Sequence, residues 1–108
     1  MRVLVTGGRN HWAWGDLEKV LSELNPTVII QGGARGADQM ARQYANSRGI
    51  YLITYHYLKQ HDKAGGPMRN KFMINDTKPD VCVACSGGTG TASCVALAKK
   101  AGVEIRHV

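Results

Sequence analysis

Short apolar runs alternate with helical patterns along the whole of this chain. The runs are three or four residues long, are rich in valine, isoleucine and leucine, and span residues 3–5, 28–30, 50–53, 81–84 and 103–105. Runs of this kind are typical of strands that are covered on both faces, and strands that alternate with helices form parallel sheets. The pattern therefore predicts an α/β fold, a three-layer open parallel five-stranded sheet with helices on both faces.

The segments between the runs carry helical signals. In the first segment, apolar residues recur at i, i+3, i+4 and i+7, at Leu17, Val20, Leu21 and Leu24. We expect Asp16 to cap this helix and Pro67 to lie in the first turn of the third helix. Gly49 and Gly102 are expected to end the second and fourth helices. Right-handed crossovers would join these elements in the order β-α-β-α-β-α-β-α-β.

Four glycine-bearing turns lie along the chain, and three of them directly follow an apolar run. Glycine lets backbone N–H groups approach a ligand closely, and the first amides of a helix have no internal partner. Open parallel sheets bind ligands outside the carboxyl ends of their strands, where such turns meet. The sequence therefore predicts one pocket for a phosphate-bearing ligand. The predicted ligand-binding residues are Thr6, Gly7, Gly8, Arg9, Gly33, Ala34, Arg35, Asp38, Arg69, Asn70, Ser86, Gly87, Gly88, Thr89, Gly90 and Thr91.

The turn at residues 86–91 is the most specific of the four, because it joins the fourth apolar run to a helix and supplies hydroxyls among three glycines. Its backbone amides and the hydroxyls of Thr89 and Thr91 would hold a phosphate or a ribose. The alternative is a tight turn in which glycine serves only to fit. No Gly-Lys-Ser/Thr follows at the Walker spacing, so magnesium-dependent NTP hydrolysis has little support.

Charged side chains in the other turns are further ligand candidates. Arg35 is expected to reach a phosphate, and Arg69 and Asn70 to present a forked cation and an amide to the same pocket. For Arg69 the alternative is a surface ion pair, and Arg9 has a similar setting. Asp38 either orients its loop by accepting backbone N–H bonds, which is the role we expect, or holds a ribose hydroxyl.

The connection from residue 55 to residue 66 is long for a compact domain, which is typical of lids and binding loops. Tyr55 in this connection and Trp12 in the first connection are predicted to stack on a base, although aromatic residues more often serve in packing. Asp62, in the same long connection, supplies a candidate carboxylate.

Composition narrows the class of partner. The 108 residues are expected to form one domain, 1–108, and a chain of this size gains from a shared interface, so we expect a homo-oligomer, a dimer or a tetramer. The net charge of +6 favours a polyanionic partner. No run approaches the roughly 20 apolar residues of a membrane span, so we expect a cytoplasmic protein without a membrane partner.

The three cysteines do not form a regular disulfide framework. Cys82 and Cys85 are three residues apart in a predicted strand, so their side chains point to opposite faces of the sheet and do not make a metal pair. We therefore expect buried thiols, and the sequence predicts neither a metal site nor a cofactor.

Four segments resemble the small YspA-like branch of the SLOG superfamily, and the resemblance spans nearly the whole chain. They are Val5-Thr6-Gly7-Gly8-Arg9, Gly33-Ala34-Arg35-Gly36-Ala37-Asp38, Ala64-Gly65-Gly66-Pro67-Met68-Arg69-Asn70 and Gly87-Gly88-Thr89-Gly90-Thr91. The superfamily includes nucleotide-ligand sensors of bacterial defence systems, the lonely-guy phosphoribohydrolases and DNA-processing protein A. The resemblance implies a Rossmann-like sheet and a pocket for nucleotides or their derivatives, such as ADP-ribose-like signals.

The resemblance also bears on catalysis. In the phosphoribohydrolases, an arginine of an Arg-Lys-x-x-Met type segment works with a glutamate shortly after the Gly-Gly-x-Gly-Thr loop to cleave an N-glycosidic bond. Arg69 and Met73 match the first segment, but Ser93 and Cys94 stand where the glutamate is expected. General acid or base work commonly contributes about 10² to 10⁴ in rate, and the remaining candidate carboxylates are Asp38 and Asp62. Arg69, Asp38 and Asp62 are therefore the catalytic candidates.

Three functional hypotheses follow. The leading one is a binding module that captures a small nucleotide-derived ligand for sensing or sequestration, in phage or bacterial defence or counter-defence. The alternative is a nucleotide N-glycosidase in which Arg69 steadies the substrate and Asp38 or Asp62 replaces the missing glutamate. The third is single-stranded DNA binding, suggested by positive charge and DNA-processing relatives, which would weaken steeply with salt.

Overall fold

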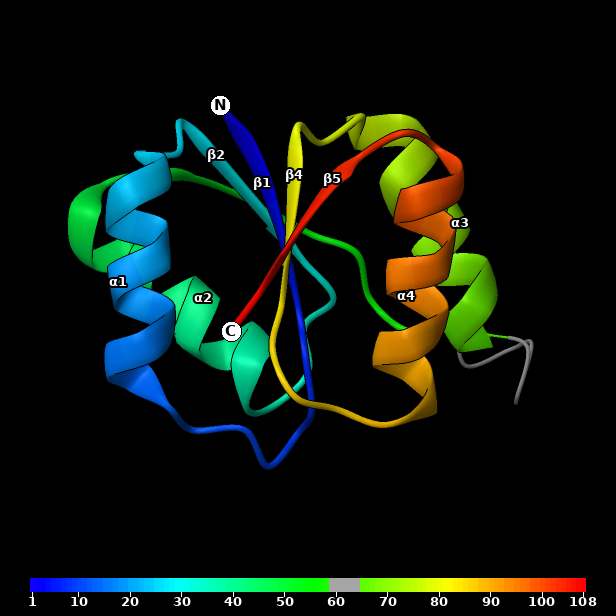
Figure 1. Ribbon diagram of the computed structural model, residues 1–108, viewed down its shortest axis with the longest axis horizontal. Coiled ribbons are helices and arrows are strands. Elements are labelled where there is room, and N and C mark those ends of the chain that lie inside the picture. Colours follow the sequence, from blue (N-terminus) through cyan, green and yellow to red (C-terminus); the bar gives the residue numbers. More distant parts are fainter. Residues whose placement is uncertain (59–64) are drawn as a thin grey trace.

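The computed structural model describes residues 1–58 and 65–108. Strands and helices alternate along the described chain (Figure 1). The strands are β1 (Arg2–Thr6), β2 (Val28–Gln31), β3 (Tyr51–Thr54), β4 (Val81–Ala84) and β5 (Glu104–His107). The helices are α1 (Trp14–Leu24), α2 (Ala37–Arg48), α3 (Gly65–Thr77) and α4 (Thr89–Lys100). Each apolar run forms a strand, so the predicted order of elements is confirmed.

The five strands are parallel and lie in the order β3-β2-β1-β4-β5. In the centre of the sheet, Val3 of β1 pairs with Ile29 of β2 on one side and with Val81 of β4 on the other. The chain therefore runs outward from β1 to β3, returns, and runs outward again from β4 to β5. This reversal makes the carboxyl ends of β1 and β4 the topological switch point, which is where open α/β sheets bind their ligands.

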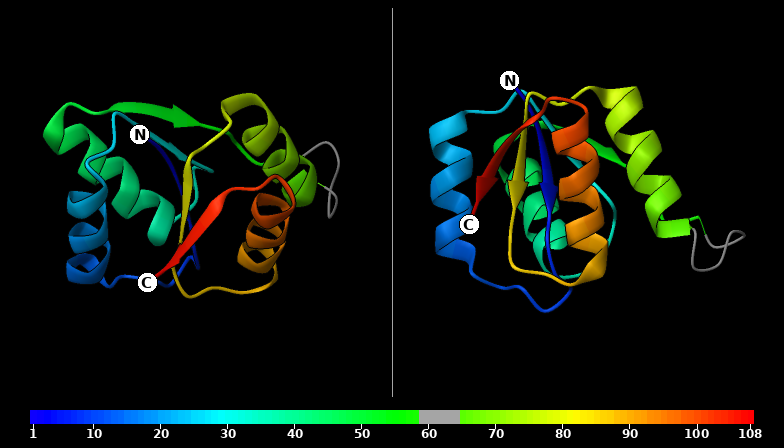
Figure 2. Two further views of the ribbon diagram at one scale, coloured as in Figure 1. Left: turned by 45° about the horizontal axis from the view of Figure 1, so that its top comes forward. Right: turned by 45° about the vertical axis from the view of Figure 1, so that its right-hand side comes forward.

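Helices cover both faces of the sheet, α1 and α2 on one face and α3 and α4 on the other (Figures 1 and 2). Val3 and Val5 of β1 pack with Met40 on the first face, whereas Leu4 packs with Met73 on the second. This alternation follows from the two-residue period of a strand. The prediction of a three-layer α/β fold is therefore confirmed. No helix in the described ranges has the length and apolar content that a bilayer crossing needs.

The helix ends agree with the sequence signals except at the start of α1. This helix begins at Trp14, and its N-cap residue, Ala13, makes no side-chain capping bond. The prediction that Asp16 caps the helix is wrong, because Asp16 lies inside the first turn, where its charge favours the positive end of the helix dipole. Gly49 (φ 65°) ends α2 and Gly102 (φ 78°) follows α4 in left-handed conformations, as predicted.

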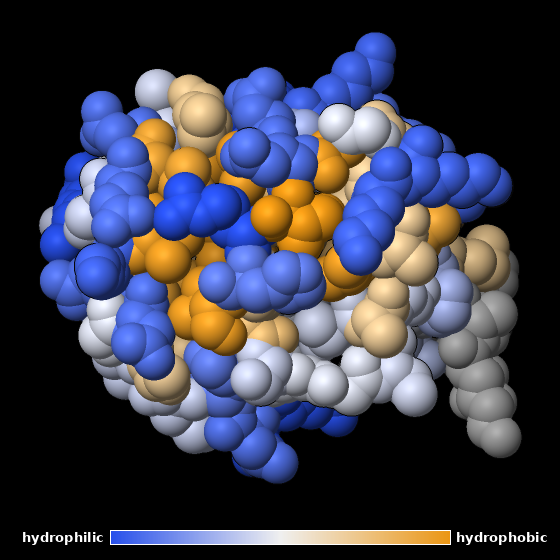
Figure 3. Space-filling model, in the orientation of Figure 1, coloured by the Kyte–Doolittle hydropathy of each residue, from blue (hydrophilic) through white to orange (hydrophobic). Residues whose placement is uncertain are grey.

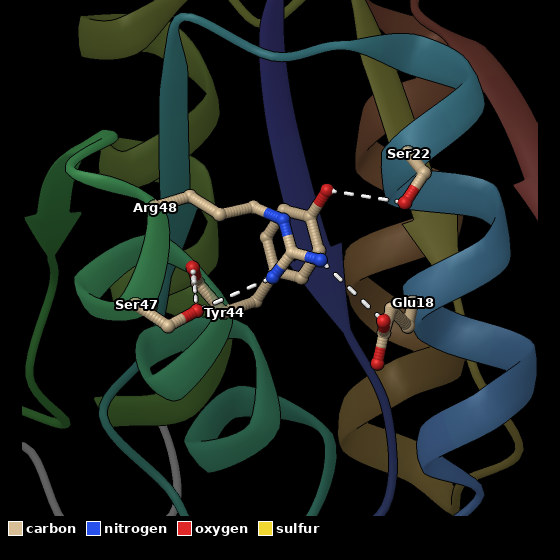
Figure 4. Close-up of polar contacts among 5 residues, drawn as sticks. All are labelled: Glu18, Ser22, Tyr44, Ser47 and Arg48. Atoms are coloured by element: carbon tan, nitrogen blue, oxygen red, sulfur yellow. Dashed lines mark hydrogen bonds and ion pairs between the residues drawn. The ribbon is translucent and has the colours of Figure 1, made fainter.

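Polar side chains join α1 to α2 beside the buried core (Figure 4). The Arg48 guanidinium lies 4.1 Å from the centre of the Tyr44 ring, and its Nη2 lies 3.4 Å from Glu18 Oε1. The Tyr44 hydroxyl lies 3.4 Å from Ser22 Oγ on α1. The exposed ion pair contributes at most about 1 kcal/mol. The stacked Tyr44 ring, which is 7% exposed, is therefore the main contact of this group.

The carboxyl end of β1 is closely packed around Gly7. A Cβ at this position would lie 2.6 Å from the Cβ atoms of both Ala37 and Cys85. Both neighbours are buried, so neither side chain is free to move away. We therefore expect Gly7→Ala to lower the free energy of unfolding, measured by urea denaturation, by about 1–3 kcal/mol.

Gly15→Ala is the matched control for this measurement. A Cβ at Gly15, in the first turn of α1, would meet no atom within 4 Å. Alanine is favoured over glycine in a helix interior by about 0.8–1 kcal/mol, so this variant should be at least as stable as the wild type. A Gly7→Ala protein that unfolds at the same urea concentration as Gly15→Ala would contradict the packing described for Gly7.

Candidate functional site

A pocket of about 320 Å³ opens at the carboxyl edge of the sheet, beside the ends of β1 and β4. This edge lies at the bottom of Figure 1. Residues from each of the four glycine turns line it, so the turns meet at the switch point. The lining residues are Thr6, Gly7, Gly8, Arg9, Ala34, Asp38, Tyr57, Gly66, Arg69, Asn70, Gly88, Thr89, Gly90 and Thr91.

The backbone of Gly8 joins three of these turns. Its N–H donates to the Ser86 carbonyl (2.7 Å), and its own carbonyl accepts the N–H of Ala37 at the start of α2 (3.3 Å). Gly36 passes so close that a Cβ there would lie 2.2 Å from the Gly8 carbonyl oxygen, and Gly36 also has a φ of 71°. Glycine is therefore required at residue 36 for the turns after β1 and β2 to approach each other.

The side chains of nearby residues accept hydrogen bonds from the backbone of the turn after β2. Asp38 Oδ2 accepts the N–H groups of Gly32 (3.1 Å) and Ala34 (3.3 Å), and Gln31 Oε1 accepts the N–H of Gly33 (2.7 Å). Asp38 thus orients its loop, which is the role expected for it. The amides of Gly32, Gly33 and Ala34 are therefore already bonded within the protein and are not open to a phosphate.

Asp38 is a buried carboxyl group, 6% exposed, in the wall of the pocket. Burial raises the pKa of Asp38 above its ordinary value of 3.8, and this effect outweighs the Ala34 and Gly32 amides and the charges of Arg69 and Arg42, which lower it. The second oxygen, Oδ1, accepts no hydrogen bond from the described residues. It is therefore available to a donor group of a ligand.

Arg69 ties α3 to the neighbouring turns. Its Nη1 donates to the carbonyls of Gly32 (2.8 Å) and Tyr55 (3.1 Å), and its Nε donates to Asn70 Oδ1 (2.8 Å). The Asn70 amide in turn lies 3.4 Å from the Gly90 carbonyl. Nη2 has no hydrogen-bond partner in the described part of the chain. One edge of the guanidinium is thus structural, and its remaining nitrogen can bind an anion in the pocket.

The turn between β4 and α4 offers four open backbone amides in a row. The N–H groups of Gly88, Thr89, Gly90 and Thr91 donate to no acceptor among residues 1–58 and 65–108. They form the first turn of α4, where the helix dipole adds positive charge. A Cβ at Gly88 or Gly90 would meet no atom within 4 Å, and neither residue has a positive φ. The packing of the protein itself therefore does not require glycine at either position.

Four of the predicted ligand residues lie outside the pocket lining that the described residues form. Arg35 is exposed at the surface, and Gly33 lies behind the lining with its N–H bonded to Gln31. Ser86 and Gly87 line a neighbouring hollow next to the same turn. These positions lie within the predicted turns but do not contribute to the lining of the pocket.

The predicted base-stacking residues are also placed elsewhere. Trp12 is exposed (47%) and does not line the pocket, and Tyr55 donates its hydroxyl to Asp76 on α3 (2.9 Å). Asp62, the other candidate carboxylate, lies outside the described residues.

Tyr57 and Gly66 line the pocket and were not among the predicted ligand residues. The Tyr57 ring packs over the start of α3, where a Cβ at Gly65 would lie 3.0 Å and one at Gly66 3.2 Å from ring carbons. The sequence signal for this contact is the Gly65-Gly66 pair at the start of the helix, because the two missing side chains leave room for an aromatic ring there. Tyr57 therefore takes the place in the lining that Tyr55 was expected to have.

The three cysteines are buried, and none of them forms a disulfide. Burial and then the charge of Asp38 raise the pKa of Cys85 to about 11. The hydrogen bond with Cys94, together with burial, raises the pKa of Cys82. No group of three His, Cys, Asp or Glu side chains within the described ranges is placed to hold a metal ion. The polar chemistry of the pocket therefore comes from open amides, hydroxyls, two arginines and Asp38.

The raised pKa of Asp38 predicts how its replacement changes the pH dependence of stability. A carboxyl whose pKa is raised on folding stabilises the protein fully below its unfolded pKa of 3.8, and this contribution is lost as pH rises through the raised, folded pKa. Asp38→Asn keeps one oxygen to accept the Gly32 and Ala34 amides but does not titrate. We therefore expect the stability of the wild type relative to Asp38→Asn to fall as pH rises through this window.

The measurement is urea denaturation of both proteins between about pH 3 and pH 7. Other ionisable groups are common to the two proteins and cancel in the difference. A difference that is constant across this range, or that moves in favour of the wild type with rising pH, would show that burial does not dominate the pKa of Asp38.

Comparisons with known proteins agree with this architecture. A model of the YspA, cpYpsA-related SLOG family matches residues 1–61. The Gene 61 protein of Mycobacterium phage D29 is 33% identical over 120 aligned residues, which cover 96% of this chain and 93% of the phage protein. Among solved structures, the Moco carrier protein from Chlamydomonas reinhardtii has a TM-score of 0.67 at 22% identity, covering 99% of this chain and 75% of that chain. At this identity the structural match shows the fold.

Proposed function

The chain belongs to the YspA, cpYpsA-related SLOG family, and we propose that its pocket binds a phosphate-containing nucleotide derivative for sensing or sequestration. The phosphate lies at the start of α4, on the amides of residues 88–91. The ribose lies against Asp38, and the remainder of the ligand extends toward Tyr57. The protein binds this ligand and does not catalyse a reaction on it.

Gly88 and Gly90 carry the proposal. Glycine in a helix interior is less favourable than alanine by about 0.8–1 kcal/mol, so Gly90 in the first turn of α4 is a cost to the fold. Neither a steric contact nor a positive φ accounts for either glycine. A ligand that lies directly on the backbone does account for them, since a Cβ at either position would cover the open amides that line the pocket.

The charges around the pocket support an anionic ligand. Arg9 lines the pocket from the turn after β1, and Nη2 of Arg69 faces the same space from α3. Arginine suits phosphate because its planar fork can make paired hydrogen bonds. Asp38 Oδ1, in contrast, would accept a hydrogen bond from a hydroxyl or N–H group of the ligand. A sugar phosphate carries both kinds of group a few ångströms apart, which matches this arrangement.

The relatives support a small ligand rather than a polymer. The SLOG family name is shared with nucleotide-ligand sensors, and the Moco carrier protein is by its name a carrier of a small molecule. The similarity to a mycobacteriophage protein supports a role in phage or bacterial defence or counter-defence. A pocket of about 320 Å³ is at the lower end of the range for small-molecule sites, about 300–1,000 Å³.

Gly90→Ala tests the proposal without disturbing the fold. Isothermal titration with AMP, ADP-ribose and cyclic dinucleotides first identifies a ligand of the wild type. We expect Gly90→Ala to weaken that ligand by at least about tenfold, because a hydrogen bond to a charged group contributes about 1.5–3 kcal/mol and the new methyl group covers the amides. Stability in urea should be equal to or higher than that of the wild type.

Gly15→Ala again serves as the control. It makes the same change in the first turn of another helix, in equally open space but away from the pocket. It should bind the ligand like the wild type. Unchanged binding by Gly90→Ala, or no binding of any of these nucleotides to the wild type, would exclude the proposed site.

A nucleotide N-glycosidase is the second candidate, and one observation favours it. Asp38 lines the pocket with a pKa raised by burial, and a raised pKa is what a general acid needs near neutral pH. Chromatography of nucleoside monophosphates after long incubation decides between the two functions. Release of free base by the wild type and its loss in Asp38→Asn would establish the enzyme, whereas intact nucleotide that stays bound would establish the binding module.

A further inference from the structure

A second hollow lies on the other side of the β4–α4 turn from the candidate pocket. Its volume is about 380 Å³, and its lining is mainly apolar. One wall is a face of α4 formed by Ala92, Val95 and Ala96, and the hollow ends at Lys99 and at His107 of β5. Figure 3, in the orientation of Figure 1, shows apolar patches interrupted by hydrophilic side chains on the side of the molecule that carries β5. No part of the proposed function uses this hollow.

The two hollows meet at Gly88 and Thr91, which line both. Gly88 has no side chain to divide them, and the space where its Cβ would stand is open. The open amides of α4 lie at this same crossing point. A phosphate bound there has one space on the side of Asp38 and Tyr57 and another on the side of Val95 and Lys99.

We propose that the second hollow binds the second nucleoside of a dinucleotide whose linking phosphates cross Gly88. The inference rests on the proposed function, because the phosphates must first lie on the amides of residues 88–91. The apolar wall of Ala92, Val95 and Ala96 suits the flat face of a base, and small side chains on this wall leave it the necessary depth. Lys99, in the last turn of α4, supplies a cation at the end of this hollow that lies away from Gly88.

Each hollow carries positively charged side chains. Arg9 and Arg69 line the first hollow, and Lys99 lines the second. A nucleoside monophosphate occupies the first hollow and leaves the second hollow to water. A pyrophosphate-linked dinucleotide enters both hollows and removes the apolar wall of Ala92, Val95 and Ala96 from water, which adds affinity.

The test compares two probes that differ only in the second nucleoside. Titration with ADP, GDP, CDP and UDP selects the best base, and the symmetrical pyrophosphate-linked dinucleotide of that base is then compared with its nucleoside diphosphate. A stacked base contributes about 1–3 kcal/mol by side-chain truncation, so we expect the dinucleotide to bind at least about fivefold to tenfold tighter than the diphosphate.

Two variants test whether the higher affinity of the dinucleotide comes from the second hollow. Ala96→Leu fills the hollow from an exposed helix position and should reduce the dinucleotide to the affinity of the diphosphate, leaving diphosphate binding unchanged. Lys99→Ala should weaken the dinucleotide more than the diphosphate. Lys100→Ala is its control, because it removes an equal charge from the next residue, which is outside this hollow.

The outcomes separate this inference from the proposed function. Diphosphate binding that is lost in Gly90→Ala, with no gain from the second nucleoside or with the same gain in Ala96→Leu and Lys99→Ala, would overturn the second subsite and leave the first intact. No binding of any diphosphate or dinucleotide to the wild type would overturn both. A dinucleotide gain that disappears in Ala96→Leu and persists in Lys100→Ala establishes the subsite.

Discussion

The close approach of Gly8 to its two neighbours is the contact on which the carboxyl edge of this protein depends. Its amide holds the β4–α4 turn through Ser86, and its carbonyl holds the start of α2 through Ala37. Both bonds need the backbones to lie almost in contact, which glycine at residues 7, 8 and 36 permits. The sheet order alone puts β1 beside β4. The Gly8 contacts turn that adjacency into a pocket with fixed walls, because they lock the turns to one another.

This arrangement divides the glycines of the rim into two kinds. Those at residues 7, 8, 32, 36 and 87 stand where a Cβ would meet atoms of another turn, so they allow the loops to pack. Gly88 and Gly90 face open space instead. The amides divide in the same way, since those of residues 8 and 32–34 are bonded within the protein and those of residues 88–91 are open. The run of open amides at the start of α4 is therefore the place where the proposed phosphate would bind.

Much of the fold, and part of the candidate site, could be predicted from the sequence. The apolar runs marked the strands and the glycine turns marked the rim, because both depend on local composition. The direction of single side chains did not follow. Asp38 and Arg35 lie three residues apart in one turn, yet the first is buried in the pocket wall and the second is exposed. Tyr55 was the tyrosine predicted for the pocket, whereas Tyr57 packs on Gly65 and Gly66, a contact between segments of which the sequence shows only the pair of glycines.

The residues at the start of α4 explain why binding is favoured over glycosidic cleavage. The phosphoribohydrolases that this family resembles carry a glutamate shortly after the glycine loop, whereas the chain has Ser93 and Cys94 there. Cys94 is 1% exposed and packs with Cys82 in the core beneath the helix, so this position serves packing and does not face a substrate. Asp38 lies in the pocket, but its Oδ2 holds two loop amides. A carboxylate that moves a proton during each reaction cycle would loosen the turn that it closes. The pocket carboxylate thus holds the turn after β2 in shape, which supports the proposal that the chain binds its ligand without cleaving it.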